Sequence, residues 1–238
     1  GGTLISKVLA TQPNVVLISE VSPRGFASPR FNPFDPLELF FTTYVNKGRF
    51  KLEAPFAEKL KIFTQRIRML HDLVRAEGQH LVLRDHAHSD FMYKKPANKS
   101  GLLMSLQRLG RPTLGIVTLR DPVDSYLAGE ANKTNGSVHS FDEYCRRALI
   151  MAESYGDAPI FRYEDFVRDT PAVLAQMCAA LKLEFDGTAI DGFATWQLTG
   201  DSGRKGKNIE LRARRPMTAQ QEKAVADSAH YRLFCETY

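Results

Sequence analysis

Apolar residues recur along the chain with two spacings, and each spacing predicts one kind of element. Where they return every three or four residues, they predict amphipathic helices. Helices are expected at 3–10, about 36–47, 55–77, 99–109, 122–131, 140–155, 170–183 and about 218–229. Short, unbroken apolar runs predict strands that are buried on both faces. Strands are expected at 14–20, 79–85, 113–120 and 158–166, the last turning into a helix.

The expected strands alternate with helices, which is typical of a parallel sheet covered on both faces. The 238 residues fit one domain, so we expect a single α/β domain over 1–238 with a central parallel sheet flanked by helices. In such folds, ligands bind beyond the carboxyl ends of the strands. These ends carry Glu20 and the segments 84–86, 120–122 and 162–165.

Composition narrows the class of protein only slightly. Hydrophobic residues make up 43% of the chain, enough for a large core, and the formal charge of +5 weakly favours anionic partners. Three widely spaced cysteines without a CxxC pair fit reduced thiols, so we expect a cytoplasmic protein. No apolar run approaches the roughly 20 residues of a membrane span. No signal peptide is visible.

Gly1, Gly2 and Thr3 lie directly before the first expected helix. Glycines let a ligand approach the backbone, and free amides at a helix start suit phosphate or a similar anion. The alternative is a flexible helix start without a ligand. The pattern GxxxxGK[ST] is absent, because Thr3 follows Gly2 where that pattern has lysine. This argues against a kinase that uses a magnesium nucleotide.

Arg120 ends an expected strand and precedes Pro122, which suits the first turn of a helix. Its guanidinium fork is able to bind a terminal phosphate through two hydrogen bonds. The alternative is a surface ion pair with Asp121 or Asp124. Ser125, five residues further on, is a second possible donor or simply a helical serine.

A basic segment at 202–215 is expected to be a loop that clamps a polyanion, or else a solvated run of charge. Its basic residues are Arg204, Lys205, Lys207, Arg212, Arg214 and Arg215. No aromatic residue interleaves with these charges, so nucleic-acid binding is poorly supported.

The general base has candidates at two strand ends. His86 and His88 follow one expected strand, and Glu20 ends another. An imidazole changes charge near neutral pH, which suits a general base. As metal ligands the two histidines are weakly supported, because no further Cys or His lies nearby. A hydrogen-bonded loop histidine is the alternative to both roles.

Together, these segments resemble the PAPS-dependent sulfotransferase family, where PAPS is 3′-phosphoadenosine 5′-phosphosulfate. Gly1-Gly2-Thr3 is similar to the end of the family's 5′-phosphosulfate loop, Lys/Arg-Ser-Gly-Thr-Thr. Arg84-Asp85-His86 lies where the cytosolic branch has Lys-Thr-His, and Arg120-Asp121-Pro122 resembles Arg-Asn/Asp-Pro. Tyr163-Glu164-Asp165 is similar to the family's Tyr-Glu-Asp segment, and Arg204-Lys205-Gly206 matches its last phosphate loop.

The resemblance implies a three-layer, P-loop NTPase-like domain. Its activity would be transfer of a sulfuryl group from PAPS to a hydroxyl or amine by in-line displacement, without a metal. His86 then corresponds to the base of the cytosolic branch, while Glu20 resembles the glutamate base of the Golgi and tyrosylprotein branches. The residues implied to bind PAPS are Gly1, Gly2, Thr3, Leu4, Arg120, Ser125, Tyr163, Arg204, Lys205 and Gly206.

The chain departs from the family at several points. The basic residue of the first loop and the strand before it are not among these residues, and they are expected upstream of Gly1. Leu4 stands where a tryptophan often stacks on adenine, and Ala128 stands at the family's serine, for which Ser125 is the possible substitute. A non-catalytic module that binds a nucleotide or an acidic polymer therefore remains an alternative, as does a small-molecule kinase on a related fold.

The acceptor itself is not readable from the sequence. A small molecule, a peptide or a glycan is expected, and residues 22–75 are expected to line its pocket. Several phenylalanines in this stretch suggest an apolar acceptor, although core packing explains them equally well. They are Phe26, Phe31, Phe34, Phe40 and Phe41.

Overall fold

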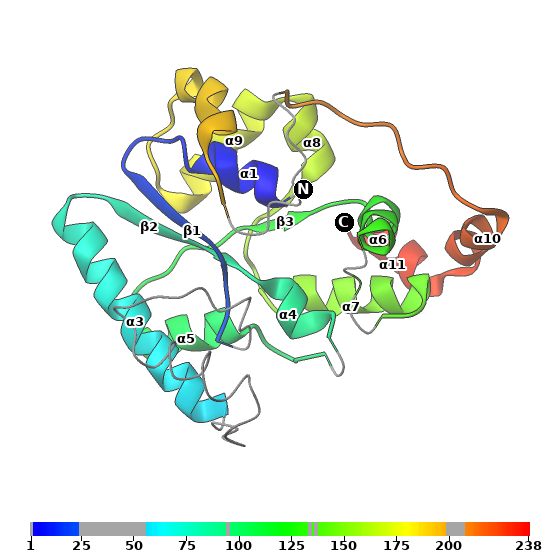
Figure 1. Cartoon of the computed structure of the whole chain (residues 1–238), viewed down its shortest axis with the longest axis horizontal. Helices are drawn as coiled ribbons and strands as arrows, with labels where there is room; N and C mark the ends of the chain where they lie inside the picture. Colours follow the sequence, from blue (N-terminus) through cyan, green and yellow to red (C-terminus); the bar gives the residue numbers. More distant parts are fainter. Residues whose placement is uncertain (1, 24–55, 94–95, 133–134, 136–137, 199–207) are drawn as a thin grey trace.

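The computed structural model describes residues 2–23, 56–93, 96–132, 135, 138–198 and 208–238. Helices and strands alternate through most of this part of the chain (Figure 1). The strands are β1 (Val15–Val21), β2 (His80–Asp85), β3 (Val117–Leu119) and β4 (Ile160–Arg162). The helices of the first half are α1 (Gly2–Leu9), α3 (Phe56–Ala76), α4 (Ala87–Phe91) and α5 (Gly101–Leu109). Those of the second half are α6 (Pro122–Ala131), α7 (Phe141–Glu153), α8 (Tyr163–Arg168), α9 (Thr170–Leu181), η2 (Gly187–Thr195), α10 (Ala219–Asp227) and α11 (Ala229–Thr237).

The strands pair in parallel, as the sequence predicts, but they form two small sheets. β1 pairs with β2, with Val15 opposite His80, and β3 pairs with β4, with Val117 opposite Ile160. The expectation of a single central sheet is therefore met only in part among the described residues. The fold is a mixed α/β fold, largely helical, with two parallel two-stranded sheets.

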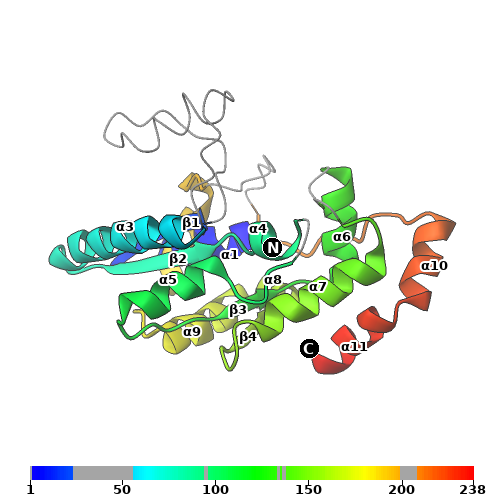
Figure 2. The ribbon, with the colours of Figure 1, turned by 90° about the horizontal axis from the view of Figure 1, so that it is seen from below.

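Helices cover both faces of each sheet. On one face, a core shared by both sheets packs against α1, α8 and α9, with Leu17 and Val82 from the first sheet and Ile116 and Phe161 from the second. On the other face, α3 and α5 lie over the first sheet, and α7 and α11 lie over the second, where they enclose Val117. Figure 2 places α6, α10 and α11 at the opposite end of the molecule from α3.

Local sequence signals fix several helix starts. Asp121 caps α6 by accepting hydrogen bonds from the amides of Val123 and Asp124, and Pro122 occupies its first turn. Ser100 accepts from the amide of Leu103 at the start of α5. These caps satisfy amides that have no partner within the helix, so the helices begin where the sequence predicts.

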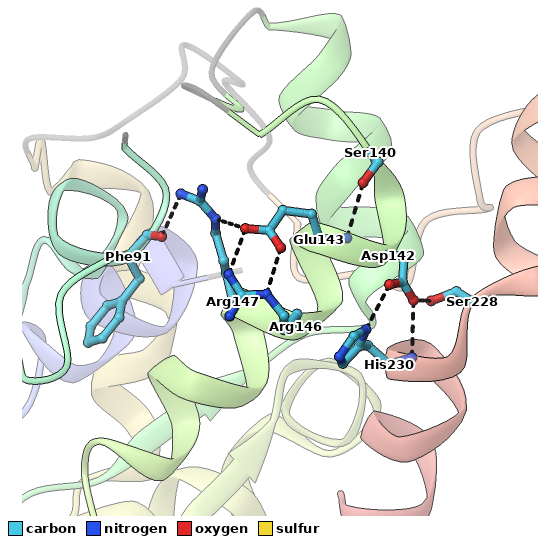
Figure 3. A network of polar contacts seen from close by, with 8 residues as sticks. All are labelled: Phe91, Ser140, Asp142, Glu143, Arg146, Arg147, Ser228 and His230. Carbon is cyan, nitrogen blue, oxygen red and sulfur yellow. Dashed lines mark hydrogen bonds and ion pairs between the residues drawn. The ribbon is translucent and has the colours of Figure 1, made fainter. Parts of the chain in front are cut away.

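Helix α7 is fixed to its neighbours by two polar groups (Figure 3). Glu143 accepts hydrogen bonds from Arg146 and Arg147, and Arg147 also donates to the carbonyl of Phe91 at the end of α4, 3.2 Å away. At the outer end, Asp142 accepts from Ser228 and from His230 on α11. The Arg147 side chain is only 7% exposed, so its charge depends on Glu143 for compensation.

We expect Glu143→Gln to lower the free energy of unfolding at neutral pH by about 2 kcal/mol, because a hydrogen bond to a charged group is worth about 1.5–3 kcal/mol. The hydrogen bonds from Arg146 and Arg147 hold the pKa of Glu143 at about 2. The unfolded value is about 4.3. The stabilisation by the Glu143 carboxylate is therefore fully present above the unfolded pKa, and it is lost as pH falls towards 2.

Urea unfolding at pH 2–7 measures this difference. The difference in free energy of unfolding between wild type and Glu143→Gln should become smaller as pH falls from about 5 towards 2. Asp165→Asn is the matched control, because its pair with Arg168 is exposed on both sides and should contribute little. A gap that stays constant down to pH 2 would contradict this account of Glu143.

Several details differ from the sequence predictions. The last expected helix, near 218–229, corresponds to α10, and the helix α11 that follows was not predicted. Ser228 ends α10 and caps α11 by accepting from the amide of Tyr231. The short α4 and the 3₁₀ helix η2 were not predicted. β3 and β4 are shorter than expected, with three residues each. The helix expected at about 36–47 lies outside the described residues, as do the five phenylalanines of the expected acceptor pocket.

Cys145 and Cys178 are buried thiols and Cys235 is an exposed one, so all three cysteines are free. Within the described ranges, none of the helices combines the length and the apolarity needed to cross a bilayer.

Candidate functional site

A cavity of about 1400 Å³ extends between the two sheets and is lined along the whole length of β2 and β3. It brings together residues from the two sheets and from the helices that follow them. The sequence-predicted site residues that line it are Gly2, Glu20, His86, Arg120, Ser125 and Tyr163. These residues thus line one cavity, while their assignment as site residues stays a prediction.

Arg84 connects the start of α1 to the end of β1. One guanidinium nitrogen donates to Thr3 Oγ1 at 3.2 Å and to Ser19 Oγ at 3.0 Å, and the other lies 3.5 Å from Glu20 Oε1. A Cβ at Gly2 would lie 3.2 Å from this guanidinium, which explains why glycine suits the position. Burial lowers the pKa of Arg84, partly offset by the charge of Glu20. The Arg84 side chain is 24% exposed and forms an ion pair with Glu20.

Arg120 lies directly after β3, at the opposite side of the cavity. Its guanidinium carbon lies over the ring of Tyr163, 5.1 Å from the ring centre, which orients the side chain by a cation–π contact. Arg120 Nε is buried and makes no hydrogen bond within the described residues. A buried N–H that lacks a protein acceptor is suited to an anionic oxygen of a ligand.

The alternative of an ion pair between Arg120 and its neighbouring acids is not what the structure shows. Asp121 and Asp124 are instead paired with Arg214, at 2.8 Å and 3.0 Å. Asp121 also caps α6, and its amide donates to Glu164 Oε1. The acids beside Arg120 are thus occupied. Arg214, which the sequence placed among clamp residues, stabilises the start of α6.

The two candidate bases have different surroundings. Glu20 takes a left-handed conformation, φ 58°, at an irregularity in the pairing of β1, and its carboxylate faces Arg84. A non-glycine residue in this conformation is strained, and such strain is often found at functional sites. His86 occupies the N-cap position of α4 but makes no capping hydrogen bond with its side chain, and its Nδ1 is buried without a hydrogen-bond partner among the described residues. The imidazole is thus not held by another side chain through that nitrogen.

Asp85 fixes the end of β2. It accepts hydrogen bonds from Ser100, which starts α5, and from the hydroxyl of Tyr155, 2.6 Å away. Burial raises the pKa of Asp85 in spite of these two hydrogen bonds. Asp85 thus connects the end of β2 to the start of α5 and to the residues that follow α7. These contacts fix the backbone next to His86 and so position His86 relative to the cavity.

The remaining site predictions have mixed outcomes. Thr3 and Leu4 do not line the cavity: Thr3 approaches it through Arg84, and Leu4 packs against the shared core rather than facing a ligand. Ala128 lines the cavity near Ser125, one turn away on α6. Gly1, Arg204, Lys205 and Gly206 lie outside the described residues.

Sequence reasoning missed two features of this site. Arg84 and the group formed by Asp85, Ser100 and Tyr155 were not assigned roles, although Arg84 and Asp85 lie at a predicted strand end. Their place at the end of a predicted strand was the one signal in the sequence, because the residues that they contact are distant in sequence. No group of three or more possible metal ligands is found among the described His, Cys, Asp and Glu residues.

Comparisons with protein-family models, with curated proteins and with solved structures find no match to this chain. The geometry of the cavity and the resemblance of its motifs are therefore the two grounds on which a function can be argued.

Proposed function

We propose that the chain is a sulfotransferase that moves a sulfuryl group from PAPS to a hydroxyl or amine. The observation that carries the proposal is the placement of Arg120. Arg120 lines the cavity that is also lined by Gly2 and His86, and its buried Nε has no hydrogen-bond partner among the described residues. The acids that sequence reasoning offered as its alternative partners are paired with Arg214.

The cofactor would lie across the cavity from Arg120 to the start of α1. Arg120 would bind the 3′-phosphate through its guanidinium fork, which provides both charge and directional donors. The amides at the start of α1 would face the 5′-phosphosulfate, because the first amides of a helix have no partner within it. Arg84, which touches Thr3, would add positive charge on that side.

Tyr163 would contribute in two ways. The guanidinium of Arg120 lies over its ring, which orients that side chain. The family resemblance implies that the ring also lies near the adenine. Ser125, on the first turns of α6, lines the same cavity and would add a hydroxyl donor for the 3′-phosphate.

The transfer would be an in-line displacement. His86 takes the proton of the acceptor hydroxyl or amine, whose oxygen or nitrogen then forms a bond to sulfur. The bond between sulfur and the bridging oxygen of the 5′-phosphate breaks, and adenosine 3′,5′-bisphosphate leaves with the electron pair. Amides at the start of α1, with Arg84 nearby, stabilise the charge that develops on the leaving phosphate.

Arg120→Ala tests the cofactor part of this proposal. We expect adenosine 3′,5′-bisphosphate to bind about 30-fold more weakly, or about 2 kcal/mol, because a charge-assisted hydrogen-bond pair is lost. Isothermal calorimetry measures the affinity, and circular dichroism checks that the fold is retained.

Arg168→Ala is the matched control, since Arg168 is an exposed arginine whose partner Asp165 lies on the same helix. It should leave the affinity for the bisphosphate unchanged. Equal affinities in wild type and folded Arg120→Ala would remove Arg120 from the site and with it the main support for PAPS.

A further inference from the structure

Helix α7 turns one face towards the cavity between the two sheets. Tyr144, Ala148 and Met151 line the cavity, and they share this face because residues three or four positions apart lie on one side of a helix. Tyr144 carries the one hydroxyl of the three and lies in the first turns of α7. The cofactor contacts proposed above do not use this hydroxyl.

Helix α6 turns a matching face towards the same cavity. Ser125, Ala128 and Asn132 line the cavity, at intervals of three and four residues. Val123 and Leu127 of the same helix belong to a buried cluster with residues of α7, so the two helices pack against each other. The cavity face of α6 therefore lies beside the cavity face of α7.

The side chain of Tyr144 is held where these two faces meet. Its ring centre lies 5.5 Å from that of Tyr126 at an interplanar angle of 67°, and the ring packs against the buried cluster of α6 and α7. Its hydroxyl is hydrogen-bonded to Ser125 and lies within reach of the charge of Arg120. Three polar groups, from the end of β3, from α6 and from α7, thus gather at one side of the cavity.

The hydroxyl of Tyr144 keeps its hydrogen at neutral pH. Burial raises the pKa of Tyr144 to about 12, and the hydrogen bond with Ser125 and the charge of Arg120 oppose this rise only in part. A neutral phenol is a hydrogen-bond donor. Ala128, one turn from Ser125, has no polar side-chain atom, so Tyr144 provides beside Ser125 the second hydroxyl that this face of α6 lacks.

We infer that Tyr144 is a further ligand of the cofactor, which donates its hydroxyl hydrogen to the same 3′-phosphate that Arg120 and Ser125 would hold. The inference rests on the proposed function, since it adds a residue to that cofactor site. Hydroxyl hydrogens rotate to suit their acceptors, so both hydroxyls of the Ser125–Tyr144 pair are able to turn towards one phosphate oxygen. Tyr144 is then a specificity residue, because it contacts only the phosphate that AMP lacks.

Tyr144→Phe tests this assignment, because it removes the hydroxyl and keeps the ring that packs against Tyr126. We expect the affinity for adenosine 3′,5′-bisphosphate to fall about tenfold, since a hydrogen bond to a charged group is lost. The affinity for AMP should change by less than about twofold, because AMP has no phosphate at this position. Isothermal calorimetry with each nucleotide measures both affinities, and circular dichroism checks that the fold is retained.

Tyr126→Phe is the matched control, since it removes a hydroxyl from the same pair of rings and Tyr126 does not line the cavity. It should leave both affinities unchanged. If wild type prefers the bisphosphate to AMP and Tyr144→Phe binds it equally well, the inference is overturned and the proposed function stands. An equal loss for both nucleotides in Tyr144→Phe would also overturn it, because Tyr144 would then act through packing. A wild type that does not distinguish the two nucleotides would overturn the inference and the proposed function together.

Discussion

His86→Ala should lower kcat by about 10²–10⁴-fold while leaving the affinity for adenosine 3′,5′-bisphosphate nearly unchanged. A positioned general base contributes a factor of this size to proton transfer. His86 follows β2 in one sheet, whereas Arg120 follows β3 in the other, so the loss of the imidazole should not disturb the 3′-phosphate contact. Its Nδ1 is buried and has no hydrogen-bond partner among the described residues, so no neighbouring side chain holds that nitrogen.

Initial rates with radiolabelled PAPS and a panel of hydroxyl and amine acceptors measure this effect. His139→Ala is the matched control: His139 is exposed, precedes α7 and does not line the cavity, so its loss should not change the rate. Titration with the bisphosphate separates a loss of chemistry from a loss of binding.

Glu20→Gln distinguishes the two candidate bases. The charge of Glu20 is engaged by Arg84, so we expect its replacement to have a smaller effect on kcat than that of His86. A near-normal rate in His86→Ala with an inactive Glu20→Gln would reverse the assignment. The glutamate-type branch would then be the better relative. If neither variant is impaired, His88, which also lines the cavity, is the next candidate.

Local sequence signals predicted much of the fold. Apolar periodicity and caps are short-range properties, so α5, α6, α7 and α9 begin within one or two residues of the expected positions. Helix α11 was not predicted; Ser228 ends α10 and caps α11, so one residue serves both helices. The five-residue α4 is too short to show a period.

Strand pairing was harder to predict, because it depends on segments far apart in sequence. Periodicity indicates that a strand is buried but not which strand lies beside it. The sequence therefore gave parallel strands correctly and did not show that β2 and β3 leave a space between them. Residues 113–116 were expected in a strand, yet β3 begins at Val117.

The same limit applies to the site. The strand-end position of Arg120 and Glu20 was readable from the pattern. The pairing of Asp121 with Arg214, 93 residues away, was not. Likewise, the contact between Asp85 and Tyr155 spans 70 residues and leaves no local trace. Such contacts decide whether an arginine is already paired or able to bind a ligand, so they needed the structure.

Nucleotide preference should be the largest binding effect. Adenosine 3′,5′-bisphosphate should bind about 100-fold more tightly than AMP, or about 2.7 kcal/mol, because AMP lacks the phosphate that Arg120 and Ser125 would hold. A preference of this size requires a second phosphate site that is positioned in advance. The ring of Tyr163 supplies such positioning for Arg120.

Thermal unfolding with each nucleotide is the measurement that tests the central claim most directly. At about 100 times its dissociation constant, the bisphosphate should add about 2.7 kcal/mol to the free energy of unfolding. For a chain of this size that raises Tm by roughly 5–10 °C. AMP at the same concentration should change Tm by less than about 2 °C. Equal shifts with the two nucleotides, or no shift with either, would contradict a PAPS site at the strand ends.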